Sequence, residues 1–210
     1  SKEAFELAVK MGNEINADIL LATDPDADRL GVYVRDDKTG EYHVLTGNMS
    51  GCLLAEYEIS QMKEAGQLPD DAALIKTIVT TNIAKYYNVR LIEVLTGFKY
   101  IGEQILNFET TKKGHYAFGF EESYGCLIGT HARDKDAVVA TMALCEAVAY
   151  YKTKGMSLWD KMIEMYERYG YWSDGVQSIT LKGKEGIEKI QNTIEKLREN
   201  VPTEIAGYKV

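Results

Sequence analysis

The feature that most constrains the fold is a regular alternation of short apolar runs with longer helical patterns after residue 40. Short runs rich in branched and aromatic residues predict strands, whereas apolar residues at intervals of three and four predict helices. Strands are expected at 42–46, 74–80, 90–95 and 115–120, and helices at 48–65, 81–88, 99–109, 135–153 and 157–169. This alternation is typical of an α/β domain with helices on both faces of a sheet.

The first 40 residues predict a helix and two strands. Residues 2–11 have one apolar side and are followed by Gly12, which we interpret as the end of the helix. The mostly apolar run at 17–23 predicts a buried, parallel strand. Residues 30–34 predict the next strand, and a turn is expected at 36–40.

Two later helices carry more specific predictions. The helix at 135–153 is apolar nearly all round, so we expect it to be packed centrally. The helix at 157–169 opens with Ser157 and Asp160 in the spacing of a capping box.

The sequence changes character after Gly170. Residues 171–181 predict one more strand, and residues 184–199 predict an amphipathic helix. The last ten residues suggest no packing partner.

Composition argues against several classes of protein. With 45% hydrophobic and 27% charged residues, the 210-residue chain is typical of a globular protein. It has no apolar run of about 18 residues, so no membrane partner is expected. Its net charge of −8 argues against a broad nucleic-acid surface. Three cysteines without CxxC spacing indicate reduced thiols in a cytoplasmic protein, and we expect them to pack on helices: Cys52, Cys126 and Cys145.

The loop TDPDADR, residues 23–29, carries the clearest chemical signal. Asp24, Asp26 and Asp28 alternate just after a predicted strand, and ligands bind at the carboxyl ends of strands in α/β sheets. Three carboxylates this close repel one another unless a cation lies among them, and oxygen ligands favour Mg²⁺ or Ca²⁺. Arg29 is placed to hold a phosphate beside the metal. The alternative is a solvated turn, since Asp and Pro both favour turns.

Three other acidic motifs fit this loop less well. An EF-hand loop starting at Asp24 needs Gly and Glu at positions that here hold Arg29 and Arg35. An aspartyl-phosphatase DxDx(T/V) motif requires Thr or Val where Asp28 stands. A sugar-nucleotide DxD loop accounts for neither the third aspartate nor Arg29.

A glycine turn stands between a predicted strand and a predicted helix. Gly97 lets a ligand approach the backbone, Phe98 follows it, and Lys99 lies near a helix start, where an anion is favoured. An ordinary turn with an exposed lysine is the alternative.

The string GFEESYG, residues 119–125, ends a predicted strand rich in aromatic residues. Glu121, Glu122 and Ser123 form an acceptor set suited to the neighbouring hydroxyls of a sugar. Alternatively, the two glutamates belong to a turn or a helix start.

The string HARDKD, residues 131–136, precedes the long apolar helix. Arg133 and Lys135 are cations just before a helix N-terminus, where anions are favoured, and His131 has the chemistry of an acid, a base or a phosphate donor. The alternative is a solvated charged loop in which Asp136 caps the helix.

Taken in order, TDPDADR, GFK, GFEESYG and HARDKD resemble the α-D-phosphohexomutases, the phosphoglucomutase and phosphomannomutase family. The resemblance covers almost the whole chain. It implies a three-layer α/β/α domain with a mixed sheet, the family's third domain, at residues 41–170. Residues 1–40 would be the end of a preceding α/β domain that carries the metal loop, and residues 171–210 a linker and the start of a fourth domain.

The same resemblance implies roles for individual residues. It implies that Mg²⁺ is bound by Asp24, Asp26 and Asp28. It implies catalytic roles for Arg29, Lys135 and His131. It implies contacts to the sugar and its phosphate from Gly97, Phe98, Lys99, Glu121, Glu122, Ser123 and Arg133.

Two family motifs are absent from the sequence: the T-x-S-H-N-P-like phosphoserine loop and the R-x-(S/D)-G-T-(E)-type phosphate loop. We therefore expect the central part of a Mg²⁺-dependent mutase that interconverts hexose 1-phosphate and 6-phosphate through a phosphoserine and a hexose 1,6-bisphosphate. Its partners would be a sugar phosphate and the missing first and fourth domains, and this chain alone is expected to be inactive. The alternatives are a non-catalytic module that binds metal and sugar phosphate, or a Mg²⁺-dependent aspartyl phosphatase with Asp24 or Asp26 as nucleophile.

Overall fold

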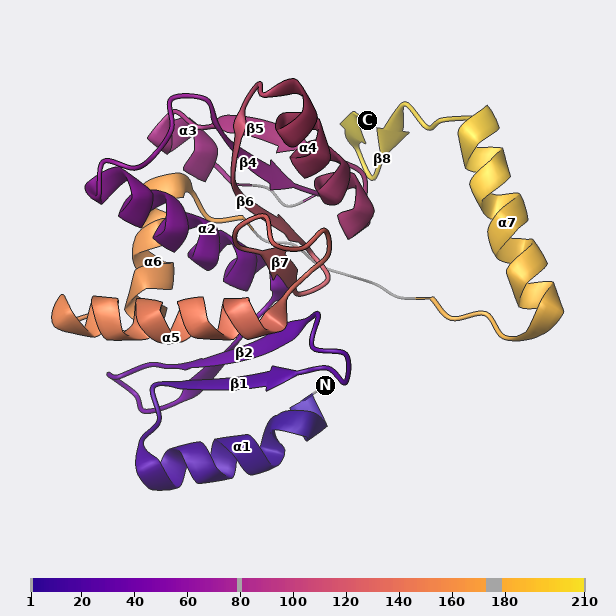
Figure 1. Cartoon of the computed structure of the whole chain (residues 1–210). Helices are drawn as coiled ribbons and strands as arrows, with labels where there is room; N and C mark the ends of the chain where they lie inside the picture. Colours follow the sequence, from indigo (N-terminus) through magenta and orange to yellow (C-terminus); the bar gives the residue numbers. More distant parts are fainter. Residues whose placement is uncertain (1, 79–80, 173–178, 210) are drawn as a thin grey trace. The chain divides into compact units, whose positions relative to one another are not determined.

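The computed structural model describes residues 2–78, 81–172 and 179–209. The chain divides into two compact units, residues 1–172 and residues 173–210. The first unit contains two sheets and six helices among its described residues (Figure 1). Every candidate site residue lies within this unit. Among the described residues, no helix is both long and apolar enough to cross a membrane.

The first unit begins with helix α1 (Lys2–Ile15) on one face of a three-stranded sheet (Figure 1). The helix continues through Gly12, so the predicted helix end at this glycine is wrong. Gly12 serves close packing instead, because a Cβ atom there would lie 2.7 Å from Leu20 Cδ2 and 2.8 Å from the Tyr42 hydroxyl.

The three-stranded sheet is antiparallel throughout, with strand order β1 (Ile19–Thr23), β2 (Leu30–Arg35) and β3 (Tyr42–Leu45). The prediction that the first strand is buried and parallel is wrong. Of its residues only Leu20 is buried, and the short acidic loop cannot make the long crossover that two parallel strands require. The acidic loop is thus the connection of a hairpin.

The second sheet is mixed, as predicted, with strand order β5 (Arg90–Glu93), β4 (Ala72–Lys76), β6 (His115–Glu121) and β7 (Gly125–Leu127). Strand β4 is parallel to both β5 and β6, whereas β7 runs antiparallel to β6. The strand predicted at 74–80 begins and ends earlier than expected. The carboxyl ends of β4, β5 and β6 therefore lie at one edge of this sheet.

Helices cover both faces of the mixed sheet. Helices α2 (Gly47–Glu64), α3 (Ile83–Tyr87), α5 (Ala137–Thr153) and α6 (Leu158–Tyr169) share the larger core, whereas α4 (Phe98–Thr111) covers the other face. Fully buried members of the larger core include Leu53, Leu74, Phe118, Phe120 and Leu144. Those of the smaller core include Ile75, Ile101, Ile105 and Leu127. The three-layer α/β/α architecture is thus confirmed, and it follows an α/β segment as expected.

Helix α5 differs from the prediction of a helix packed all round. Its inner face, with Ala140, Leu144 and Ala147, lies in the core, but Val138 and Met142 on the opposite side are each 65% exposed. Small alanines let the inner face approach its neighbours closely, so one side of the helix is enough to fill the space.

The capping box at the start of α6 is confirmed. Ser157 Oγ accepts a hydrogen bond from Asp160 N at 3.0 Å, and Asp160 Oδ2 accepts one from Ser157 N at 3.0 Å. These two bonds satisfy backbone donors that would otherwise have no partner at the helix start.

Cys126 and Cys145 are free thiols. Cys52 lies on α2 and Cys145 on α5, as expected, but Cys126 lies on strand β7 and corrects the prediction that it packs on a helix. Burial raises the pKa of Cys126 to about 12, so this thiol is neutral and unreactive at pH 7.

The second unit consists of helix α7 (Gly183–Glu199) and a hairpin of β8 (Glu204–Ile205) and β9 (Tyr208–Lys209). The predicted amphipathic helix is confirmed. Of the strand predicted at 171–181, residues 173–178 lie outside the described residues, and the remaining positions are not in a strand.

Candidate functional site

Three of the predicted loops meet where strands β1 and β6 end. Leu30 N donates to Tyr124 O at 3.1 Å, which joins the strand after the acidic loop to the GFEESYG loop. Ala137 N donates to Ala27 O at 3.0 Å, which joins the first turn of α5 to the acidic loop. Backbone hydrogen bonds thus hold together segments that are far apart in the sequence.

The acidic loop folds around the carboxylate of Asp24. Its Oδ1 accepts hydrogen bonds from Asp28 N at 3.2 Å and Arg29 N at 3.1 Å, and its Oδ2 accepts one from Arg29 Nε at 2.6 Å. Burial raises the pKa of Asp24, but these bonds and the Arg29 charge outweigh it and lower the pKa to about 2. The loop therefore presents ionised carboxylate at neutral pH.

The three aspartates come close enough to share one cation. One carboxylate oxygen from each of Asp24, Asp26 and Asp28 lies within 4.8 Å of the other two. Asp28 Oδ1 is buried without a hydrogen-bond donor, although Arg29 Nε forms an ion pair with it at 3.3 Å. Three clustered carboxylates, one of which has a buried oxygen that accepts no hydrogen bond, are typical ligands for a hard divalent cation.

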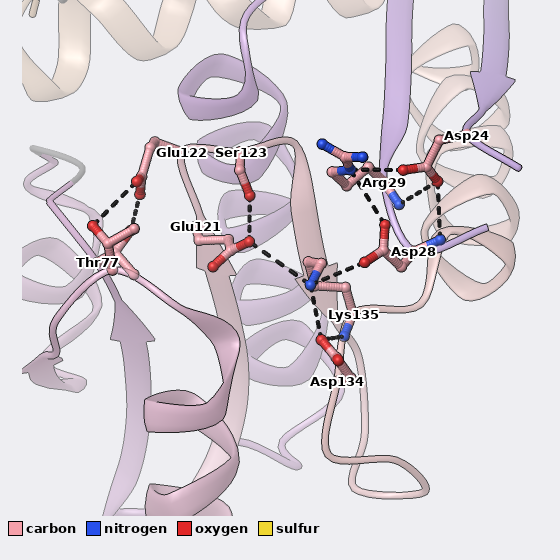
Figure 2. A network of polar contacts seen from close by, with 10 residues as sticks. Asp24, Asp28, Arg29, Thr77, Glu121, Glu122, Ser123, Asp134 and Lys135 are labelled. Atoms are coloured by element: carbon pink, nitrogen blue, oxygen red, sulfur yellow. Dashed lines mark hydrogen bonds and ion pairs between the residues drawn. The ribbon is translucent and has the colours of Figure 1, made fainter. Parts of the chain in front are cut away.

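Lys135 lies between the acidic loop and the GFEESYG loop (Figure 2). Its Nζ atom is 3.0 Å from Asp28 Oδ2, 2.9 Å from Asp134 Oδ1 and 4.0 Å from Glu121 Oε1. Burial lowers the pKa of Lys135, but the neighbouring carboxylates outweigh it and the pKa is raised. The stem of the side chain crosses Gly125, where a Cβ atom would lie 2.0 Å from Lys135 Cδ.

The adjacent glutamates of the GFEESYG loop point in different directions (Figure 2). Glu121 is buried, accepts a hydrogen bond from Ser123 Oγ and faces Lys135. Glu122 instead accepts hydrogen bonds from the hydroxyls of Thr77 and Thr96, the latter at 3.2 Å. The loop therefore turns one carboxylate towards the acidic loop and the other away from it.

The glycine turn brings one of its three predicted residues to this cluster. Phe98 is 3% exposed, and its ring centroid lies 5.6 Å from Lys135 Nζ. Gly97 directly precedes helix α4 and has a φ of 122°, a conformation that favours glycine. Lys99 is exposed, and its ammonium lies over the ring of Tyr100 rather than among the acidic residues.

Two residues of the HARDKD string have partners outside the cluster. Arg133 pairs with Glu109 on α4 at 2.5 Å. His131 Nε2 lies 2.9 Å from Asp136 Oδ2, and Asp136 caps helix α5 through its other oxygen. The structure therefore groups Lys135 with the acidic loop but does not bring Arg133 to it.

The structure adds polar residues at the strand ends that the sequence interpretation missed. Thr77 follows β4 directly and is 1% exposed, Lys76 beside it is 2% exposed, and Thr96 follows β5. The Lys76 ammonium pairs with Glu93 at the end of β5. The rule that ligands bind at strand ends would have identified these positions, but the strand predicted at 74–80 placed Lys76 and Thr77 inside it.

The comparison with protein families agrees with this geometry. The family model for "Phosphoglucomutase/phosphomannomutase, alpha/beta/alpha domain III" matches residues 46–169. The chain belongs to this family. The match includes the GFEESYG loop, the glycine turn and Lys135, whereas the acidic loop lies before the matched residues.

Curated relatives in the family extend the similarity over the acidic loop. A phosphoglucomutase from Staphylococcus epidermidis is 36% identical over 208 residues, which are 99% of this chain and 38% of the relative. A phosphoglucomutase from Staphylococcus aureus is 39% identical over 207 residues, which are 99% of this chain and 37% of the relative. The chain thus spans less than two fifths of the length of these family members.

Solved structures in the family share the fold. A Thermus thermophilus protein described as a phosphomannomutase matches with a TM-score of 0.59 and 19% identity, over 80% of this chain and 35% of that protein. Parafusin, a phosphoglucomutase from Paramecium, matches in its open form with a TM-score of 0.55 and 18% identity, over 79% of this chain and 28% of that protein.

Proposed function

We propose that this chain supplies the metal-binding and sugar-binding loops of a Mg²⁺-dependent phosphohexomutase. The whole protein would interconvert hexose 1-phosphate and hexose 6-phosphate through a phosphoserine and a hexose 1,6-bisphosphate. The observation that carries the proposal is the cluster of Asp28, Lys135 and Glu121, in which the family's acidic loop and sugar loop share one lysine. Reduced thiols at Cys126 and Cys145 would fit the cytoplasmic location expected from the sequence.

The acidic loop suits Mg²⁺ because its three clustered side chains offer carboxylate oxygens and include a buried oxygen of Asp28 that accepts no hydrogen bond. Asp24, Asp26 and Asp28 would hold the ion. When bound, Mg²⁺ neutralises charge on a phosphoryl group that is being transferred. Arg29 holds Asp24 in place and is itself 55% exposed at its side chain, so it can also reach a phosphate oxygen.

Glu121 and Ser123 would bind sugar hydroxyls, since they lie on the side of the loop that faces Lys135. The Lys135 ammonium would then balance the charge of Glu121 or contact the sugar phosphate. Phe98 would line the same side. Because Lys99, His131 and Arg133 have other partners here, phosphate contact or proton transfer by them requires their side chains to turn.

The aspartyl-phosphatase alternative with Asp24 as the nucleophile has less support from the geometry. A nucleophilic aspartate needs a carboxylate oxygen that can reach a phosphorus atom. Both oxygens of Asp24 accept hydrogen bonds within the loop, which lowers their nucleophilicity. Family membership also favours the mutase over a phosphatase.

Binding and turnover measurements test the proposal. Calorimetry should show that the chain binds Mg²⁺ and that Asp26→Asn weakens this binding at least tenfold, whereas Asp37→Asn, in the exposed turn after β2, leaves it unchanged. No difference between the two variants would contradict the assigned metal site.

Glucose 1-phosphate with Mg²⁺ and glucose 1,6-bisphosphate should bind without turnover, and turnover well above a blank would overturn the expectation that this chain alone is inactive.

The encoded sequence on either side of the chain distinguishes the mutase from a non-catalytic module. A phosphoserine loop upstream and a phosphate-binding loop downstream would support the mutase. If both are missing, a module that binds metal and sugar phosphate without turnover becomes the better interpretation.

A further inference from the structure

Glu122 is tied to the ends of two other strands. Its Oε2 accepts a hydrogen bond from Thr77, which follows β4, and its Oε1 accepts one from Thr96, which follows β5. Glu122 itself follows β6 directly. One carboxylate therefore connects the carboxyl ends of three neighbouring strands.

This link leaves Glu122 with no oxygen directed at the predicted sugar site. Both of its oxygens accept threonine hydrogens, whereas Glu121 and Ser123 on either side of it bond to each other and face Lys135. The alternation of side chains along the loop thus separates two tasks. One side of the loop holds it in place, and the other presents acceptors.

The backbone of the loop is also supported by the first turn of α2. A Cβ atom at Gly47 would lie 2.2 Å from Glu122 O and 2.7 Å from Tyr124 N. The helix start therefore packs directly on the loop backbone, without a side chain between them. Together with the two threonines, this contact limits the positions that the loop can occupy.

We propose that Glu122 is a positioning residue rather than a sugar ligand. Through Thr77 and Thr96 it holds the loop so that the oxygens of Glu121 and Ser123 are presented to the substrate. That the substrate is a sugar phosphate rests on the proposed function above. The link between the loop and the other two strands is a separate matter, because it depends only on the hydrogen bonds of Glu122 with Thr77 and Thr96.

Thr77 provides the sharpest test, because at 1% exposure its hydroxyl cannot touch a ligand in solution. Thr77→Val should raise amide hydrogen exchange at residues 121–125 about tenfold and weaken the binding of glucose 1-phosphate, measured with Mg²⁺ present, about tenfold. Thr77→Ser keeps a hydroxyl and should restore both quantities. Thr110→Val is the matched control, since Thr110 is exposed and donates only to carbonyls of its own helix, Leu106 O and Asn107 O.

A double-mutant cycle tests whether the two residues act together. Glu122→Ala and Thr77→Val should each raise the rate of amide hydrogen exchange in the loop. The rate in the double variant should exceed the rate in Glu122→Ala by less than about twofold. If Glu122→Ala weakens glucose 1-phosphate binding while Thr77→Val changes neither binding nor exchange, Glu122 is a direct ligand and the proposal is wrong.

The exchange measurement separates this proposal from the proposed function. A wild-type chain that binds no glucose 1-phosphate would contradict the sugar-phosphate assignment. Exchange at residues 121–125 would still decide whether Thr77 and Glu122 hold the loop, and unchanged exchange in both single variants would overturn the link.

Discussion

The Lys135 ammonium lies 3.0 Å from Asp28 Oδ2 and 4.0 Å from Glu121 Oε1, so one cation joins the acidic loop to the GFEESYG loop. The side chain of Lys135 is 13% exposed and that of Glu121 is 6% exposed. Charges this far from solvent are screened weakly by salt. We therefore expect a substitution of any one of the three residues to change the electrostatic environment of the other two.

Lys135→Met should make the stability of the chain more dependent on Mg²⁺. Without the ammonium, the buried Glu121 carboxylate loses its nearby cation and Asp28 is left with Arg29, which costs about 1–3 kcal/mol of unfolding free energy in the absence of metal. A divalent cation at the acidic loop would then relieve more repulsion than in the wild type. Thermal unfolding with and without Mg²⁺ should show a larger rise in Tm for Lys135→Met.

Lys99→Met is the control for this measurement. Lys99 is exposed and lies over Tyr100, away from the acidic loop. Its removal should leave both the stability and the effect of Mg²⁺ close to those of the wild type. An equal rise in Tm on adding Mg²⁺ to the wild type and to Lys135→Met would show that the charge of Lys135 does not affect Mg²⁺ binding at the acidic loop.

Glu56→Ala should be among the most destabilising single changes in the first unit. Glu56 is 1% exposed, pairs with Lys161 Nζ at 2.9 Å and accepts hydrogen bonds from the hydroxyls of Tyr87 and Tyr169. Removing the carboxylate leaves two phenols short of an acceptor and the buried Lys161 ammonium with one carboxylate, Glu164, in place of two, at a cost of about 3–5 kcal/mol. Urea unfolding measures this loss, and Glu103→Ala on the exposed side of α4 should stay within about 0.5 kcal/mol of the wild type.

The layered fold could be predicted because hydrophobic periodicity is a local signal. The helix predicted at 48–65 and the strand predicted at 115–120 match α2 and β6 to within one residue at each end. The direction of β1 could not be obtained in this way, because its apolar composition does not distinguish parallel from antiparallel pairing. The length of the loop after it carried that information, since six residues allow only a hairpin.

The candidate site could be predicted only where its residues are neighbours in the sequence. The alternation of Asp24, Asp26 and Asp28 indicated a cluster, and the structure places their oxygens within 4.8 Å. The ion pair of Lys135 with Asp28 joins distant segments and left no local pattern. Contacts of this kind depend on how the strands order themselves in the sheet.

Glu58 should make the chain less stable as the pH rises from about 4.5 to about 6. Burial and the nearby Glu146 carboxylate raise the pKa of Glu58 from 4.5 to about 6. Between these values the folded chain binds more protons than the unfolded chain, so the unfolding free energy falls with rising pH and levels off above pH 6. Glu58→Gln should remove this fall, as measured by urea unfolding at pH 4.5 and pH 7.

Glu146→Gln is the partner test, because it removes the repelling charge but leaves Glu58 buried. The pH-dependent fall in stability should become smaller without disappearing, since burial is the larger cause of the shift. If Glu58→Gln keeps the full pH dependence between 4.5 and 6, the fall arises from other groups.

Gly125→Ala should disturb the cluster without removing any of its charged groups. Gly125 does not have the positive φ that would exclude alanine, but its added Cβ would lie 2.0 Å from Lys135 Cδ and 2.6 Å from Lys135 Cγ. The lysine stem must move away from Asp28, which we expect to cost about 1–3 kcal/mol of unfolding free energy. In a Lys135→Ala background the stem is gone, so Gly125→Ala should then cost less than about 0.5 kcal/mol. Urea unfolding of the four chains of this cycle measures the difference, and an equal cost in both backgrounds would show that the lysine stem does not pass over Gly125.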